Sequence, residues 1–186
     1  MAKRVHTDDQ VTTFMSELEK QTDRGVGIVA ASVAESALTE LIKRRLVMMS
    51  STRADLLFGR MRPLSSFSAK IELGAALGLF DHRTRSVLNM LRDVRNAFAH
   101  EMAATSFDDL EIARLVQKGR TPSVPKESSP REAFTALFYA ALGLLYGIAA
   151  VDIRIKPLSE THGDAFLGMA QALLAFAQKR ASAKKE

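Results

Sequence analysis

The sequence predicts an all-α protein, a single-domain bundle of about seven helices over residues 1–186. Three observations support this prediction. The apolar residues recur at spacings of three and four, which is the period of an amphipathic helix. The alternation of β-branched and polar residues that is typical of strands is hard to find. Only five residues are proline, so long stretches of the chain contain no helix breaker.

The first quarter of the chain predicts two helices after a mobile start over residues 1–7. The first runs from about Asp8 to Lys20, where apolar residues share one face and acidic residues come early. The second follows a break at residues 24–27, which contain two glycines, and extends to about Met48. It carries a stripe of small and apolar residues that permits close helix contact: Ala30, Ala34, Ala37, Leu38, Leu41 and Ile42.

A turn region is expected over residues 50–66, which contain paired serines, a glycine and a proline. Ser65 or Ser66 then caps a third helix, which runs to about Leu79 and is ended by the stretch that begins at Gly78. The chain is expected to turn again directly after this glycine.

A fourth helix should begin near Asp81 and continue to about Met102, because no breaker lies between them. Its apolar face repeats at helical spacing: Val87, Leu91, Val94, Phe98 and Met102. A fifth, shorter helix is expected over residues 107–118. Residues 119–130 hold three of the five prolines, so they are predicted to form a loop or a mobile linker.

Residues 133–151 carry no charge and are long enough to cross a membrane. Leucine, isoleucine, phenylalanine and valine supply fewer than half of these positions, so a buried central helix is the preferred interpretation. Gly143 and Gly147 form a G-x-x-x-G pattern, which places this helix either in the core of the bundle or at a dimer face. A last helix is expected over residues 164–180, with residues 181–186 frayed.

The composition excludes several classes of protein. With no cysteine, the chain has no disulfide framework, no thiolate zinc site and no thiol nucleophile. The first ten residues have no apolar run of the kind that a secretory signal contains. A cytoplasmic location with no membrane partner is therefore expected.

The formal net charge of +5 is mild, but cations cluster over residues 43–62 against a single carboxylate, Asp55. This basic cluster consists of Lys43, Arg44, Arg45, Arg53, Arg60 and Arg62. Such a cluster can meet phosphate groups, or it can be a solvated helix end whose cations complement the helix dipole. The second interpretation is preferred, and any contact with nucleic acid is expected to be indirect.

The familiar signatures of metal and cofactor sites are missing from the sequence. The four histidines, at positions 6, 82, 100 and 162, form no pair with metal-ligand spacing, so no metal site is predicted. The chain has no phosphate-binding glycine loop after a strand and no G-x-S-x-G nucleophile motif. No cofactor is expected.

One motif stands out in the predicted fourth helix, the run Arg95-Asn96-Ala97-Phe98-Ala99-His100. At about 100° per residue, Arg92, Asn96 and His100 lie on the side opposite the apolar residues. They form a row of hydrogen-bonding groups, one of which titrates near neutrality. Arg95 lies about 140° around the helix from His100, so the two meet only through the long arginine side chain or across a two-fold axis. The alternative is structural: Asn96 and His100 hydrogen-bond a neighbouring element and orient the packing.

Residues 27–42, 63–79 and 95–100 form three blocks that resemble the mannitol operon repressor family of small all-helical bacterial proteins. The second block is the most specific, because Phe-Ser-x-Lys-Ile followed by Ala-Leu-Gly-Leu is not a generic helix pattern. The resemblance implies a helical bundle with a regulatory role in transcription of carbon-source genes. The family has no obvious helix-turn-helix and this chain has none, so such a regulator would act by binding another regulatory protein.

The Arg-Asn-x-x-x-His block also resembles the HEPN superfamily, helical domains in which an arginine and a histidine from paired subunits cut RNA. This resemblance implies that Arg95 would hold the phosphate, that His100 would move the proton, and that Asn96 would orient one of them. Glu35 would pair with Arg95 or orient His100, and Lys70 is the other polar residue to consider.

These observations predict a non-enzymatic, homodimeric regulator, with a metal-independent ribonuclease or RNA-binding domain as the alternative. The candidate functional surface comprises Glu35, Lys70, Arg92, Arg95, Asn96 and His100.

Overall fold

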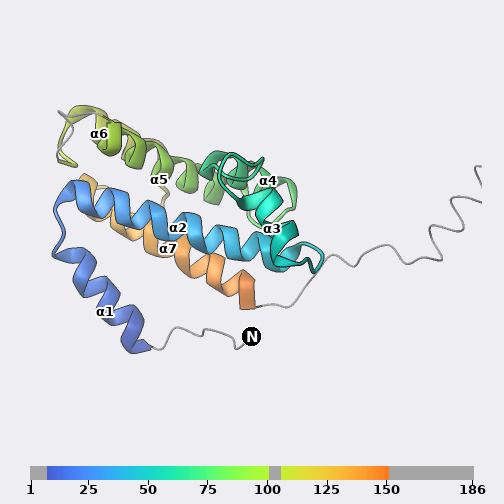
Figure 1. The fold of residues 1–186 in the computed structure, drawn as a ribbon. Helices are drawn as coiled ribbons and strands as arrows, with labels where there is room; N and C mark the ends of the chain where they lie inside the picture. Colours follow the sequence, from blue (N-terminus) through green and yellow to red (C-terminus); the bar gives the residue numbers. More distant parts are fainter. Residues whose placement is uncertain (1–7, 101–105, 151–186) are drawn as a thin grey trace, which may run out of the picture. The chain divides into compact units, whose positions relative to one another are not determined.

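The computed structural model describes residues 8–100 and 106–150, which form seven helices and no strand (Figure 1). The predicted all-α class is confirmed. The helices are α1 (Asp8–Glu19), α2 (Asp23–Arg45), α3 (Ser51–Phe58), α4 (Phe67–Ala76), α5 (His82–His100), α6 (Leu110–Gly119) and α7 (Pro130–Ala150). The expectations for residues 1–7, 164–180 and 181–186 lie outside the described residues.

Helix α2 is the centre of the described bundle. It packs against α1, α4, α5 and α7, while α6 packs against α5 and α7 (Figure 1). Ala30 and Ala34 of the predicted small-residue stripe are completely buried, as is the neighbouring Ala31. Because these side chains are short, neighbouring helices approach the α2 backbone closely, and larger side chains from those helices fill the space between them.

The predicted break at residues 24–27 is wrong, because both glycines lie inside the first turns of α2. Thr22 caps the helix, and its Oγ1 accepts a hydrogen bond of 3.2 Å from the Gly25 amide. Gly27 is needed for packing instead: a Cβ atom there would lie 2.4 Å from Cδ2 of Phe98 on α5. The glycine thus permits a close contact between two helices rather than a turn.

The chain between α2 and α4 contains a helix that periodicity did not reveal. Helix α2 ends at Arg45, three residues before the predicted Met48, and α3 occupies part of the predicted turn region. Ser50 caps α3, with its Oγ accepting from the Arg53 amide at 3.3 Å. Serines, a glycine and a proline made this segment look like a turn, and the eight-residue helix within it has no fully buried residue, although Phe58 packs half-buried against the core.

Both ends of α4 follow rules that can be read in the sequence. Of the two predicted caps, Ser66 is the N-cap of α4, because its Oγ accepts a hydrogen bond from the Ala69 amide at 3.1 Å. The helix ends at Ala76, before the predicted Leu79, and Gly78 has a φ of 64°. The Leu79 amide donates to the Gly74 carbonyl at 3.0 Å, which is the six-residue bond of a Schellman motif.

Helix α5 begins where it was predicted and keeps its predicted apolar face. Asp81 caps it, and Oδ1 accepts from the amide and hydroxyl of Thr84 at 2.9 and 2.8 Å. These two hydrogen bonds lower the pKa of the Asp81 carboxyl. The residues of the predicted face that the structure describes are all buried: Val87, Leu91, Val94 and Phe98.

The proline-rich segment forms a loop between two helices that pack on each other. Helix α6 begins at Leu110, three residues after the predicted start, and residues 120–129 connect it to α7. Arg120 spans this loop, donating to the carbonyls of Lys126 and Ser128 at 2.9 and 2.7 Å. These hydrogen bonds connect the two ends of the segment, which is therefore a loop, the first of the two predicted forms.

Helix α7 is the predicted apolar helix, and it is buried in the bundle along one face. Phe134, Leu137 and Phe138 are buried against the neighbouring helices. Gly143 and Gly147 are exposed, and a Cβ atom at either position would meet no atom of a described residue within 4 Å. The glycines therefore do not line the core of the described bundle, and their place at a dimer face stays a prediction.

Two described helices, α2 and α7, are long and apolar enough to cross a membrane by length and composition alone. Half of the most apolar window of α2 is buried in the bundle, and a third of that of α7. Core helices of soluble proteins pass the same test, so this observation is weak evidence for a membrane span.

A polar joint at Asp23 connects the start of α2 to two distant segments. The Asp23 carboxylate accepts hydrogen bonds from the Ser106 hydroxyl at 3.0 Å and the Phe107 amide at 2.9 Å, and it forms an ion pair with Arg131 of α7. Burial acts to raise the pKa of Asp23, but the hydrogen bonds from Phe107, Arg131 and Ser106 outweigh it, so the pKa is lowered. Arg24 donates to the Phe98 carbonyl at 2.6 Å near the end of α5.

We predict that Gly27→Ala lowers the free energy of unfolding by about 1–3 kcal/mol, because the added methyl group overlaps the Phe98 ring. Gly143→Ala is the matched control. It also replaces a helical glycine, but one whose added methyl group meets no described atom, so it should raise the free energy of unfolding by about 0.5–1 kcal/mol. Urea denaturation followed by circular dichroism measures both. Equal effects of the two substitutions would contradict the close contact between α2 and α5.

Candidate functional site

Three predicted site residues from three helices meet in one ion cluster, which we call the Glu35 cluster. Glu35 on α2 accepts a hydrogen bond from Lys70 of α4 at 2.8 Å, through Oε1. Its other oxygen, Oε2, accepts from Nη1 of Arg95 on α5 at 2.7 Å. One carboxylate thus joins two cations, and the cluster connects α2, α4 and α5.

The local sequence explains why these side chains converge. Lys70 lies one turn after Phe67 at the start of α4, and both are buried on the side of α4 that faces the bundle. The ring of Phe67 also supports Arg95, whose guanidinium carbon lies 5.7 Å from the ring centroid. Lys70 is 8% exposed and is the one buried charged residue among those described. A buried ammonium requires a carboxylate partner, and Glu35 supplies it.

The outer side of α5 carries a second set of polar groups. Arg92 donates to Asp93 Oδ1 at 2.7 and 3.0 Å and to the Ser68 hydroxyl at 3.1 Å. Asn96 is exposed, and its Oδ1 accepts long hydrogen bonds from Arg95 at 3.3 and 3.4 Å. His100 is exposed at the last residue of α5. Amide and imidazole groups in this position can exchange hydrogen bonds with a partner molecule.

Of the three residues predicted to form a row on the polar side of α5, Asn96 and His100 are exposed, whereas Arg92 is half-buried. Asn96 and His100 lie on the solvent side of α5 while the apolar residues face the core. Of the two roles expected for Glu35, pairing with Arg95 is the one observed, and both Glu35 oxygens are occupied by Lys70 and Arg95. Within the described residues, no hydrogen bond joins Arg95 to His100.

Sequence reasoning missed two residues that support the site, Phe67 and Ser68. They lie within the Phe-Ser-x-Lys-Ile block, so the signal was present as an unusual pattern. Their roles depend on contacts between α4 and α5. Phe67 contacts the guanidinium of Arg95, and Ser68 accepts a hydrogen bond from that of Arg92. A pattern along one helix does not show which cation of another helix it will meet.

The basic cluster is separate from the Glu35 cluster, and its members differ in their surroundings. Lys43 pairs with Glu40 at 3.2 Å and lies 5.4 Å from the centroid of the Phe58 ring. Arg44 donates to the Ala149 carbonyl at 3.1 Å, at the end of α7. Arg45 is half-buried. The remaining three cations, Arg53, Arg60 and Arg62, are exposed and form no hydrogen bond or ion pair with any described residue.

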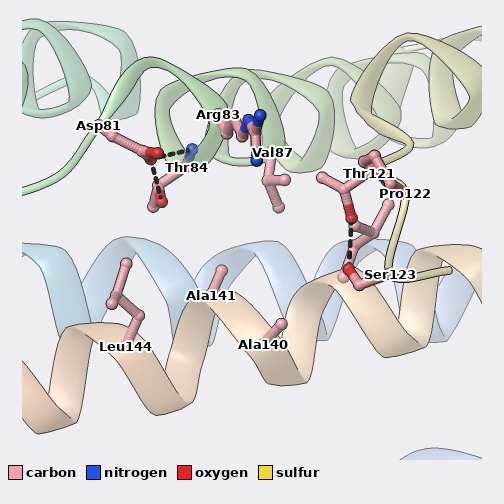
Figure 2. A pocket seen from close by; sticks show the side chains of 11 residues that line it. Asp81, Arg83, Thr84, Val87, Thr121, Pro122, Ser123, Ala140, Ala141 and Leu144 are labelled. Atoms are coloured by element: carbon pink, nitrogen blue, oxygen red, sulfur yellow. Dashed lines mark hydrogen bonds between the residues drawn. The ribbon is translucent and has the colours of Figure 1, made fainter.

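A cavity of about 490 Å³ lies apart from both clusters, between α5, α7 and the loop after α6 (Figure 2). Thr84 and Arg83 contribute polar groups at the start of α5, and Thr121 and Ser123 contribute hydroxyls from the loop. The hydroxyl oxygens of Thr121 and Ser123 are 2.7 Å apart. The apolar wall of the cavity includes Leu137 and Leu144 of α7. No feature of the sequence indicated this cavity, because it forms only where the loop packs beside α5.

The described residues contain no group of three histidine, aspartate or glutamate side chains that could hold a metal ion. The ionisable groups near α5 are instead arranged as ion pairs between cations and carboxylates.

No protein-family model matches this chain, and no match was found among the curated proteins or among the solved structures.

We predict that Glu35→Gln lowers the free energy of unfolding by about 2–4 kcal/mol, because it leaves the Lys70 ammonium buried without a charged partner. Glu72→Gln is the matched control, because it breaks the Arg85–Glu72 pair of 2.6 Å on the exposed surface. Its expected cost is below about 1 kcal/mol. Chemical denaturation at neutral pH compares the two. A Glu35 effect no larger than the Glu72 effect would mean that the cluster does not support the fold.

Proposed function

We propose that this chain is a transcriptional regulator of the mannitol operon repressor type, which acts by binding another regulatory protein. The exposed row of α5 that contains Asn96 and His100 forms part of its contact surface. The resemblance of residues 27–42, 63–79 and 95–100 supports the regulatory role. In this proposal the chain works as a homodimer in the cytoplasm, and contact with nucleic acid is indirect.

One observation carries the choice of a protein partner: the two arginines of the motif region are already paired with carboxylates. Arg95 binds Glu35 at 2.7 Å, and Arg92 binds Asp93 at 2.7 Å. Binding of a nucleic acid backbone draws on cations that can neutralise phosphates. A surface whose arginines are internally paired presents mainly the neutral amide of Asn96 and the imidazole of His100. Such groups give directional hydrogen bonds to a protein surface.

The cluster beneath this row supports the proposal in a second way. Glu35 joins α2, α4 and α5 through Lys70 and Arg95, so the backbone of α5 is held in a defined position. A contact surface that is held rigid loses little conformational entropy when a partner binds. The Glu35 cluster then acts as the support of the surface rather than as a part of it.

We predict that Asn96→Ala/His100→Ala, introduced at the chromosomal locus, deregulates the same limited set of genes as deletion of the whole gene. Both residues are exposed at the surface, so the variant should fold and accumulate normally. RNA sequencing of the three strains, with immunoblots for protein level, measures this. Gln117→Ala/Lys118→Ala on α6 is the control, because these residues are equally exposed and lie outside the row. A deletion strain whose transcripts match those of the wild type would overturn the regulatory role.

A second candidate function, metal-independent RNA cleavage, is favoured by one observation. Asn96 accepts from the guanidinium of Arg95, and His100 is exposed one helical turn further along the same side of α5. In such a reaction Arg95 would stabilise charge on the phosphate, and the His100 imidazole would transfer the proton of the attacking 2′-hydroxyl or of the leaving oxygen.

If RNA is the substrate, the full chain should cleave labelled structured or single-stranded RNA in the presence of EDTA. His100→Ala should then lower the rate by a factor on the order of 10²–10⁴, which is the usual contribution of a general acid or base. His82→Ala is the control, since His82 is also exposed on α5 but at its other end. Absence of cleavage, or equal cleavage by both variants, would exclude this function and leave the protein-contact role.

A further inference from the structure

Residues 48–61, which include helix α3 and the turns on either side of it, expose three large apolar side chains. Met48 is 85% exposed, Leu56 is 51% exposed, and Met61 is 91% exposed. Helix α3 itself has no buried residue. Figure 1 shows this segment beyond the C-terminal end of α2, at the edge of the bundle. Exposed apolar residues that are grouped in this way are typical of surfaces that bind a partner or a membrane.

The backbone holds one of these side chains outward at a conformational cost. Met61 has a φ of 58° and is the one non-glycine residue with positive φ in the described part of the chain. The turn around it is closed by two backbone hydrogen bonds, from Arg62 to Gly59 at 3.1 Å and from Leu64 to Leu57 at 2.9 Å. A strained residue that is also almost fully exposed contributes nothing to the core. Such strain is typical of functional positions.

The same segment carries the three cations of the basic cluster that have no partner among the described residues, Arg53, Arg60 and Arg62. Asp55 is the single carboxylate between residues 46 and 66. We define the α3 patch as Met48, Arg53, Leu56, Arg60, Met61 and Arg62. It combines an excess of positive charge with apolar side chains that project from the surface.

We propose that the α3 patch binds an anionic membrane surface. The arginines would lie among the lipid headgroups, and the methionines and the leucine would enter the boundary with the acyl chains. Charge complementarity selects an acidic surface, and the projecting side chains select one that can receive apolar groups. Attachment of this kind is peripheral, so it requires neither α2 nor α7 to cross the bilayer.

The composition of the patch argues against nucleic acid as its ligand. Phosphate contacts would use the arginines, but they would leave Met48, Leu56 and Met61 without a role. Single-stranded nucleic acids are usually bound by stacking on exposed aromatic rings. The one aromatic residue of α3, Phe58, is half-buried beneath the Lys43 ammonium.

The test is flotation of the purified full chain with vesicles of phosphatidylcholine that contain about a third phosphatidylglycerol, against vesicles of phosphatidylcholine alone. The full chain should float with the anionic vesicles only, and high salt should release it. Arg53→Gln/Arg60→Gln/Arg62→Gln should lower the partition coefficient on the order of a hundredfold, from the usual contribution of three cations. Leu56→Ser/Met61→Ser should lower it several-fold with no change of charge.

The matched control is Arg83→Gln/Arg114→Gln/Lys126→Gln, which removes the same charge from exposed residues outside the patch. It should float like the unchanged chain, and circular dichroism should show that every variant is folded. The proposal is overturned if the chain does not float, if the control loses as much binding as the patch variant, or if the serine variant floats undiminished. It is also overturned if the patch arginines are required for binding duplex DNA or single-stranded RNA while vesicles are not bound.

Discussion

The close contact of α5 with α2 is the constraint on which the rest of the described structure depends. It is possible because α2 presents alanines and Gly27 where another helix would carry branched side chains. Phe98 fills the space above Gly27, and its ring meets Phe107 edge to face at 5.2 Å between centroids. Phe107 in turn packs on Phe134 of α7 at 4.9 Å. A chain of aromatic rings thus runs from α5 to α7 across the core.

This contact also determines where the charged groups lie. Once α5 rests on α2, Arg95 comes within reach of Glu35, and α4 adds Lys70 from the other side. The cluster lies at the border between core and solvent, where ion pairs are partly shielded from water and removal of one partner is costly. The Glu35 cluster holds α5 in place and thereby fixes the positions of the exposed residues Asn96 and His100. Stability and surface chemistry are therefore coupled through a single carboxylate.

The two surfaces with a proposed role differ in how they are built. The row on α5 belongs to a helix whose other side is buried in the core, so its positions are rigid. The α3 patch belongs to a short helix with no buried residue and to a turn with a strained methionine. The first arrangement suits directional hydrogen bonds to a shaped partner. The second arrangement suits binding to a charged membrane surface, which does not require exact geometry.

Much of the fold followed from the sequence because it depends on local rules. The all-α class, the apolar face of α5, the Ser66 cap and the glycine that ends α4 all result from helical periodicity or from backbone conformation. The row of Asn96 and His100 followed for the same reason, since the positions of residues on one helix are set by its repeat of 3.6 residues. Pairing of Glu35 with Arg95 was among the expectations, through a family resemblance rather than through spacing.

Other features could be decided only by the tertiary structure. Gly25 and Gly27 look like a break in the sequence, but both lie within α2, and Gly27 leaves the space that Phe98 of α5 occupies. Helix α3 is only eight residues long and has no fully buried residue, so periodicity did not reveal it among the turn signals of its segment. Gly143 and Gly147 do not line the described core, although a G-x-x-x-G pattern is equally compatible with a buried helix contact. The helical class, most of the helices and the faces of single helices could be predicted from the sequence, because those depend on neighbours along the chain. The packing of helices decided which glycine is a contact, which cation is neutralised and which surface is left open, because those depend on residues that are distant in sequence.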